Sequence, residues 1–155
     1  MEIIDYARDY EAATSYFTEL VSRLKPIDLD KSAPGEWTPR QVIHHLADSE
    51  AQSYARIRRL IAEPSGSTIQ GWDEGMWAEN TVLGCTTLPV ENSIAVFKSV
   101  RAASLDILKR LSLEDLEKSG VHTEAGKYTI AKWIKNHTNH PHSHREQIEK
   151  AVAGA

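Results

Sequence analysis

The sequence predicts an all-α protein, a four-helix bundle formed by residues 1–155 as a single domain. Apolar residues recur every three or four positions along four stretches of about 20 residues each, the pattern of amphipathic helices. We find no convincing strand and no internal repeat. A chain of 155 residues is long enough to bury a core without disulfides. Four amphipathic helices of this length bury their apolar faces best in a bundle.

The first helix is expected over residues 4–24, ending before Pro26, because apolar side chains line one face throughout this stretch. The second helix should begin at the segment Thr38–Gln41. This segment combines an N-cap hydroxyl, a proline at the first helical position and a glutamine at the third. Helical periodicity then continues to about residue 63, so the start of this helix is the most firmly predicted boundary.

Between residues 63 and 88 the periodicity stops, and a loop of this length in a small domain is commonly functional. Pro89 can occupy the first turn of a third helix that continues to about Leu111. A short turn over residues 112–118 follows, and Thr129 is a plausible N-cap for the fourth helix. The bundle therefore has a long loop between its second and third helices.

Charge and cysteine content exclude several classes of protein. The formal net charge is -4 and basic residues form no long run, so nucleic acid is not an expected partner. No apolar run approaches the ~18 residues of a membrane span, and the N-terminus lacks the features of a secretory leader. Cys85 is the only cysteine, which excludes an internal disulfide. We expect a cytoplasmic protein that acts on a small molecule.

Histidines mark the most informative part of the chain. Four of the seven lie within eight positions of the fourth helix: His137, His140, His142 and His144. His140 and His144 are one turn apart on one face, close enough to bind one ion. A third ligand would have to come from another helix, and His44 and His45 are candidates there. Adjacent helical positions point about 100° apart, so only one of the two can face the core.

Three segments together resemble the DinB/YfiT-like superfamily of four-helix-bundle metalloproteins. They are Gly35–Glu50, Gly71–Ala78 and His140–Ile148. The resemblance depends on a histidine before Leu-Ala-Asp-Ser-Glu and on an HxxxH shortly before Gln-Ile, in this order and at this distance. Either half alone would be a weak signal, and together they cover most of the chain.

The resemblance implies an up-down-down-up bundle that binds a divalent metal through His45, His140 and His144. Family members of known activity include transferases that use bacillithiol, mycothiol or glutathione, and other members are described as metal-dependent hydrolases. Pro141 departs from an ideal metal-binding helix, because a proline removes one backbone hydrogen bond and should kink the helix between two ligands. The freed carbonyl is tolerable if water or a side chain reaches it.

Several neighbours could support such a site. Asp48 or Glu50 could accept a hydrogen bond from a ligand imidazole, while His44 is expected to be solvated or to support a ligand indirectly. Gln147 could orient His144 in the same way. Three loop residues could form the wall of a pocket above the metal: Trp72, Asp73 and Trp77. Each also has an ordinary structural explanation, as a solvated helix position or a loop anchor.

Three neutral histidines leave an ion with an open coordination position, as catalytic sites do. The nucleophile would then be a metal-bound water or a metal-bound thiolate, and no side chain is assigned as catalytic. Zinc is the first choice, with nickel, iron or manganese as alternatives. Cys85 has no basic neighbour in sequence, so a thiol would be a separate low-molecular-weight co-substrate.

The first function expected is a thiol S-transferase that joins this thiol to an electrophilic small molecule. The alternatives are a metal-dependent hydrolase or a non-catalytic module that binds a metal or small ligand. Bundles of this size often pair through a helix face, so a homodimer using Tyr16 or Phe17 is a general expectation.

Overall fold

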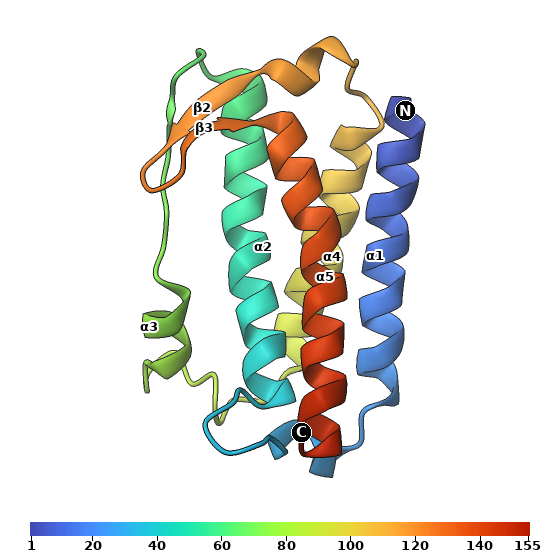
Figure 1. The fold of residues 1–155 in the computed structure, drawn as a ribbon, viewed down its shortest axis with the longest axis vertical. Coiled ribbons are helices and arrows are strands. Elements are labelled where there is room, and N and C mark those ends of the chain that lie inside the picture. Colours follow the sequence, from blue (N-terminus) through green and yellow to red (C-terminus); the bar gives the residue numbers. More distant parts are fainter.

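The computed structural model describes residues 1–155 and consists mainly of four long helices packed side by side (Figure 1). These helices are α1 (Ile3–Arg23), α2 (Pro39–Ala62), α4 (Glu91–Leu108) and α5 (Ile130–Ala153). Both α1 and α2 pack against α4 and α5, so α1 and α2 lie diagonally opposite each other. In Figure 1, α1 and α5 run downward whereas α2 and α4 run upward. The predicted up-down-down-up bundle is confirmed.

The N-cap predictions for α2 and α5 are also confirmed. The Thr38 side chain accepts a hydrogen bond from the Gln41 amide, and the Gln41 side chain accepts one from the Thr38 amide. The Thr129 hydroxyl accepts a hydrogen bond from the Lys132 amide at the start of α5. Side-chain caps of this kind satisfy amides that have no partner inside the helix, so the chain itself specifies where these two helices begin.

The prediction for the third long helix was less accurate. Val90 is the N-cap residue of α4, so Pro89 lies before the helix and not in its first turn. The helix ends at Leu108, three residues before the expected Leu111. Neither end of α4 has a side-chain cap, which explains why its boundaries were harder to predict.

The chain between α2 and α4 must return along the whole bundle, because these two neighbouring helices run in the same direction (Figure 1). This long connection was predicted, but it is not an irregular loop. It contains the two-residue strand β1 (Thr68–Ile69) and the short helix α3 (Glu74–Glu79), which packs against α2. Two 3₁₀ turns, Pro26–Asp30 and Glu114–Glu117, lie in the other connections.

The expectation that the chain contains no strand was wrong. Strands β2 (Ser119–His122) and β3 (Gly126–Thr129) form an antiparallel pair, and β1 adds to β2 in parallel. Strands of two to four residues are too short to show a period of two in the sequence. Gly120 permits the close approach of β1, because a Cβ atom at this position would lie 2.5 Å from the Ser67 carbonyl oxygen.

The core has two hydrophobic clusters stacked along the bundle. The upper cluster includes Tyr10, Ile57, Leu60, Leu108, Ile130 and Trp133. The lower cluster includes Phe17, Val42, Ile43, Leu46, Phe97 and Ile148. Buried polar residues of α2, α4 and α5 lie between the two clusters along these helices. The middle of the bundle is therefore polar although it is covered by protein.

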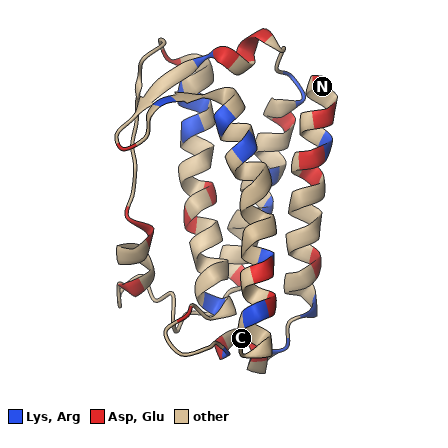
Figure 2. Cartoon of the chain, in the orientation of Figure 1, with Lys and Arg blue, Asp and Glu red and all other residues tan.

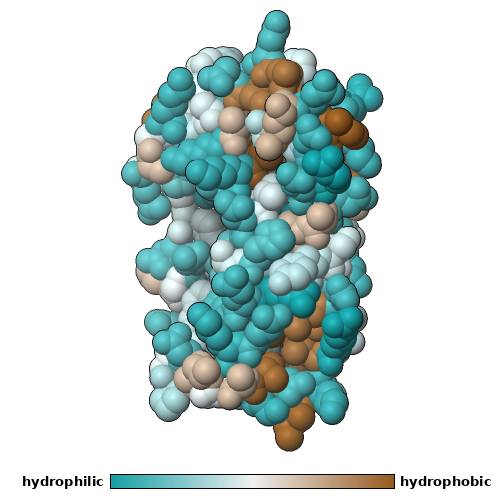
Figure 3. Space-filling model, turned by 45° about the vertical axis from the view of Figure 1, so that its right-hand side comes forward, coloured by the Kyte–Doolittle hydropathy of each residue, from teal (hydrophilic) through white to brown (hydrophobic).

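Of the two side chains named for a dimer face, Phe17 is buried in the lower cluster, whereas Tyr16 is 38% exposed and has the Arg145 guanidinium group 3.6 Å from its ring. Figure 3 shows a mainly hydrophilic face with separate hydrophobic patches near its upper and lower ends. None of the helices has the length and apolar character needed to cross a membrane.

Candidate metal centre

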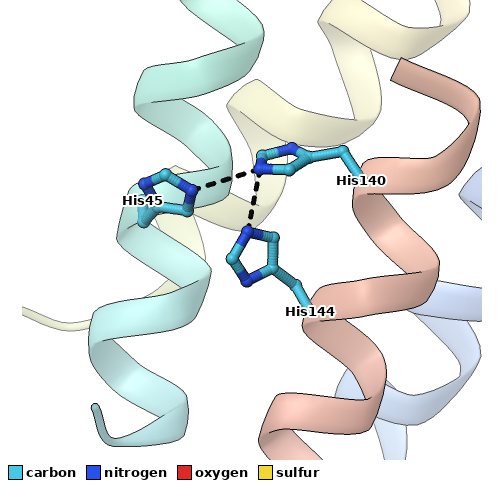
Figure 4. A group of neighbouring side chains, drawn as sticks. All are labelled: His45, His140 and His144. Atoms are coloured by element: carbon cyan, nitrogen blue, oxygen red, sulfur yellow. Dashed lines mark hydrogen bonds between the residues drawn. The ribbon is translucent and has the colours of Figure 1, made fainter. Parts of the chain in front are cut away.

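Three histidines from two helices meet in the polar middle of the bundle (Figure 4). His45 projects from α2, and His140 and His144 project from successive turns of α5. The Nε2 atom of His140 lies 3.2 Å from Nε2 of His45 and 2.8 Å from Nε2 of His144. We call these three residues the histidine triad.

The donor chemistry of the triad suits a divalent cation. Ligand nitrogens at 2.0–2.1 Å from a tetrahedral zinc ion lie about 3.3 Å from one another, and the three donor atoms here all lie within 4.8 Å of one another. The Nδ1 atom of His144 donates to the Gln147 side-chain oxygen at 2.7 Å, which leaves the Nε2 lone pair free. Lone pairs that converge in this way repel one another unless a cation or protons lie between them.

Burial keeps the triad uncharged. It lowers the pKa of His45 to about 3 and that of His140 to about 2, with neighbouring imidazoles contributing further, and it also lowers the pKa of His144. Neutral imidazoles are the form that binds metal, so protons compete weakly for these nitrogens at neutral pH.

The other histidines lie outside the triad. His137 is buried beside the Trp133 ring, and His142 is exposed and contacts the Tyr16 ring. His44 was expected to be solvated or to support a ligand, but it is buried and its ring lies 2.7 Å from the Ser93 hydroxyl and 3.1 Å from the Leu88 carbonyl oxygen. It therefore anchors the end of the long connection to α2.

Aromatic side chains surround the His45 ring. Trp72 stacks on it, with ring centroids 5.7 Å apart and planes inclined by 19°, and Trp37 lies 5.2 Å away on a tilted plane. Trp77 lies behind Trp72 at 4.8 Å. Asp73 caps α3 by accepting a hydrogen bond from the Met76 amide. Of the expected pocket residues, Trp72 contacts the triad directly, while Asp73 and Trp77 hold the segment that carries it.

The structure does not bring Asp48 or Glu50 to the triad rings. Asp48 is half-buried, and burial raises the pKa of its carboxyl group, but it forms no hydrogen bond with a triad imidazole. Glu50 is fully buried and pairs with Arg101 at 3.1 Å. The Nδ1 atoms of His45 and His140 have no hydrogen-bond partner. Gln147 is therefore the only predicted neighbour that holds a triad ring by a hydrogen bond.

Pro141 is accommodated by an arginine that sequence reasoning missed. The helix α5 continues through Pro141 as one element, although its upper and lower halves differ in direction (Figure 1). A proline cannot donate to the carbonyl four residues earlier, here that of His137. The Arg101 guanidinium donates to this oxygen at 2.6 Å. The helical spacing could have indicated that Arg101 is buried, because it lies one turn after Phe97 on the buried face of α4.

A carboxylate beside the triad was also missed. Glu74, in the first turn of α3, places an oxygen 3.7 Å from His45 Nε2, and its side chain is 63% exposed. A cavity of about 440 Å³ begins here, with His140, Glu74 and Trp72 among its lining residues. A small molecule in this cavity would therefore meet the triad at His140.

Comparisons with known proteins agree with this arrangement. A relative from Bacillus cereus, named "Putative metal-dependent hydrolase", is 33% identical over 156 residues, covering 95% of this chain and 88% of the relative. A relative from Oceanobacillus iheyensis with the same description is 29% identical over 153 residues, covering 98% of this chain and 86% of the relative.

Fold similarity extends to a solved structure of YfiT from Bacillus subtilis, described as "a probable metal-dependent hydrolase with an unusual four-helix bundle topology". The TM-score is 0.86 at 24% identity, covering 97% of this chain and 86% of that one. The model of the DinB superfamily matches residues 9–148. Relatives described as metal-dependent and a convergent histidine triad indicate a divalent metal. This chain belongs to the DinB superfamily.

Proposed function

We propose that this protein is a divalent-metal-dependent hydrolase of a small molecule, with the metal held by His45, His140 and His144. The observation that carries the proposal is the convergence of three neutral Nε2 atoms beside an open cavity. Three protein ligands leave at least one coordination position for a reactant. The descriptions of the relatives support hydrolysis as the reaction.

The bound ion would supply Lewis acidity, which lowers the pKa of a water molecule into the range where it loses a proton near neutral pH. Glu74 is the residue placed to accept that proton, because its Oε2 atom lies 3.7 Å from His45 Nε2. Gln147 holds the His144 ring in the orientation that presents Nε2. Trp72 and Trp37 shield the His45 side of the triad from solvent.

Zinc is the proposed ion because imidazole nitrogens suit it and hydrolysis needs no redox change. Nickel, iron and manganese accept the same ligands, so the metal must be identified on the purified protein.

A thiol S-transferase is the second candidate, favoured by the size of the cavity. A volume of about 440 Å³ accommodates a molecule larger than water as the nucleophile. Cys85 is buried, its Sγ atom donates to the Trp77 carbonyl oxygen at 3.8 Å, and burial raises the pKa of its thiol. Because a reactive cysteine needs a lowered pKa, the thiol for this reaction would come from a separate co-substrate.

The test begins with protein loaded separately with zinc, nickel, iron or manganese. A panel of esters and amides is assayed for hydrolysis, and a panel of electrophiles is assayed for conjugation to low-molecular-weight thiols, each with and without a chelator. His45→Ala removes one proposed ligand, and His142→Ala removes an exposed histidine of α5 as the matched control.

We expect chelator-sensitive ester hydrolysis that His45→Ala abolishes and His142→Ala retains. Turnover only in the presence of thiol would select the transferase. Metal binding with no turnover of any substrate would indicate a non-catalytic binding module. If His45→Ala binds metal as tightly as the unmodified protein, the proposed site is wrong.

A further inference from the structure

The cavity beside the triad extends away from it, toward the end of the bundle that carries the sheet. Its lining comes mainly from α2 and α5, with single residues of α3, β2 and β3, and few of the lining side chains are hydrophobic. Arg56 of α2 and Lys132 of α5 are its two permanently cationic residues. Figure 2 shows that positive side chains gather on the upper parts of α2 and α5, while the middle of α5 carries no charge.

Neither of these cations has a carboxylate partner. Arg56 donates one hydrogen bond, from Nη2 to the Gln70 carbonyl oxygen at 2.8 Å, and its buried Nε atom has none. No acidic oxygen lies within salt-bridge distance of Arg56 or Lys132. Arg40 and Arg101, in contrast, are each paired with a carboxylate of the protein. Cationic side chains that line a cavity without a carboxylate partner are typical of a site that receives an anion.

The carboxylates near the cavity lie at other places along it. Glu74 is next to His45, and it lines an adjoining hollow together with Asp73, Glu124 and Arg56, but none of the three carboxylates is within salt-bridge distance of Arg56. Lys132 precedes His140 by eight residues of α5, which corresponds to about 12 Å along a helix. The cavity thus has a reactive end at the triad and a cationic end one small-molecule length away.

We propose that this cavity binds a substrate that carries an anionic group, a carboxylate or a phosphate, and that Arg56 and Lys132 recognise this group. The orientation, with the anionic group at the cationic end and the reacting bond at the triad, rests on the proposed function. The binding of the anion itself does not, because it needs no turnover. Arg56 and Lys132 line the same cavity, where a guanidinium and an ammonium group can each donate hydrogen bonds to an anion.

Binding is tested by titrating zinc-loaded full-length protein with succinate and, separately, with inorganic phosphate in a calorimeter. The probe that binds more tightly identifies the anionic class. We expect Arg56→Gln and Lys132→Gln each to weaken this binding about tenfold, the effect of losing one charge-assisted hydrogen bond. Arg59→Gln and Lys135→Gln are matched controls, since they remove the same charges from exposed positions on the same two helices and should leave the affinity unchanged.

Two results would overturn the proposal. One is the absence of binding of either anion. The other is binding that vanishes when zinc is removed but is unaffected by Arg56→Gln and Lys132→Gln, because the anion would then be coordinating the metal. Circular dichroism of each variant establishes that it is folded, and Lys132→Gln tests the proposal independently if Arg56→Gln does not fold.

A kinetic experiment tests whether an anionic group on the substrate also increases the rate of hydrolysis. The ratio of kcat/KM for a carboxylate-bearing aryl ester to that for its neutral counterpart should exceed one and should fall about tenfold in Arg56→Gln. Hydrolysis of both esters with no preference and no anion binding would reject this inference and leave the hydrolase proposal standing. Anion binding that depends on Arg56, with no ester hydrolysed, would reject the hydrolase proposal alone.

Discussion

Two buried polar clusters lie in the middle of the bundle, and they differ in how far their polar atoms have hydrogen-bond partners within the protein. In the first, the Arg101 guanidinium donates to the Glu50 carboxylate, to the Thr14 hydroxyl and to backbone carbonyls of Tyr10 and His137. In the second, three imidazoles direct Nε2 atoms at one another, and two of their Nδ1 atoms have no partner. Both clusters contact α5, at positions less than two turns apart.

The difference separates a structural role from a functional one. The Arg101 cluster joins α1, α2, α4 and α5 through hydrogen bonds, and Arg101 is 1% exposed with all of these bonds made to protein groups. The triad lies beside a cavity that His140 lines, and its Nε2 atoms converge on one another. Converging lone pairs repel one another, so this arrangement points to a cation between the three rings.

Acid should disrupt the metal-free bundle, which is the largest effect expected. Burial lowers the pKa of His137 and His45 to about 3 and that of His140 to about 2, and it also lowers the pKa of His144, whereas an unfolded histidine has a pKa near 6.5. The unfolded state therefore binds more protons below about pH 6.5. The free energy of unfolding should be constant above pH 7 and fall below 6.5, by about 1.4 kcal/mol per pH unit for each histidine.

Urea denaturation of the metal-free protein between pH 8 and pH 4.5 measures this dependence. Added zinc should move the loss of stability to lower pH, because it binds the neutral imidazoles of the native state. A free energy of unfolding that does not change over this range would contradict the buried, neutral state of the four histidines.

Arg101→Met should destabilise the protein by about 3–5 kcal/mol, because it leaves the Glu50 carboxylate buried without a partner. Lys98→Met removes an exposed cation from the same helix and should have little effect. The double variant Arg101→Met/Glu50→Leu removes both charges and should recover much of the loss. Chemical denaturation of the three variants measures whether the unpaired Glu50 carboxylate causes the loss of stability. A double variant as unstable as Arg101→Met would show that the unpaired carboxylate is not the cause.

Gln147→Ala tests the best-supported ring of the triad. It removes the acceptor that holds His144 Nδ1 at 2.7 Å, and loss of such a partner typically costs 10–100-fold in metal affinity. We expect a decrease of about tenfold, measured by competition with a chromophoric chelator. Glu146→Ala, at the adjacent exposed position, should bind zinc as the unmodified protein does. Equal affinities of the two variants would mean that Gln147 does not orient the ligand.

Pro141→Ala connects the two clusters and should produce the smallest effect. An alanine restores an amide that can donate to the His137 carbonyl, the group that Arg101 now reaches. Arg101→Met should then cost about 1 kcal/mol less in the Pro141→Ala background than in the unmodified protein. A double-mutant cycle by denaturation measures this coupling. Strictly additive effects would show that Arg101 does not compensate for the proline.

Much of the candidate site was foreseen because its components are local. The spacing of His140 and His144 places both on one helical face whatever the surroundings, and the Thr38 and Thr129 caps lie next to the amides that they bind. Glu74 and Arg101 were missed because their partners are distant in the sequence. Glu74 is 29 positions from His45, and Arg101 is 51 positions from Glu50, so no local pattern connects them.

The sequence by itself determined the four long helices, the two capped helix starts and the facing pair of histidines on α5, since each depends on contacts within a few residues. Only the tertiary structure decided that His44 is buried against Ser93 and Leu88, that Arg101 reaches the carbonyl freed by Pro141, and that short strands complete the bundle. The physical reason is that helical periodicity encodes which face is buried. The identity of the group opposite that face depends on how separate helices pack.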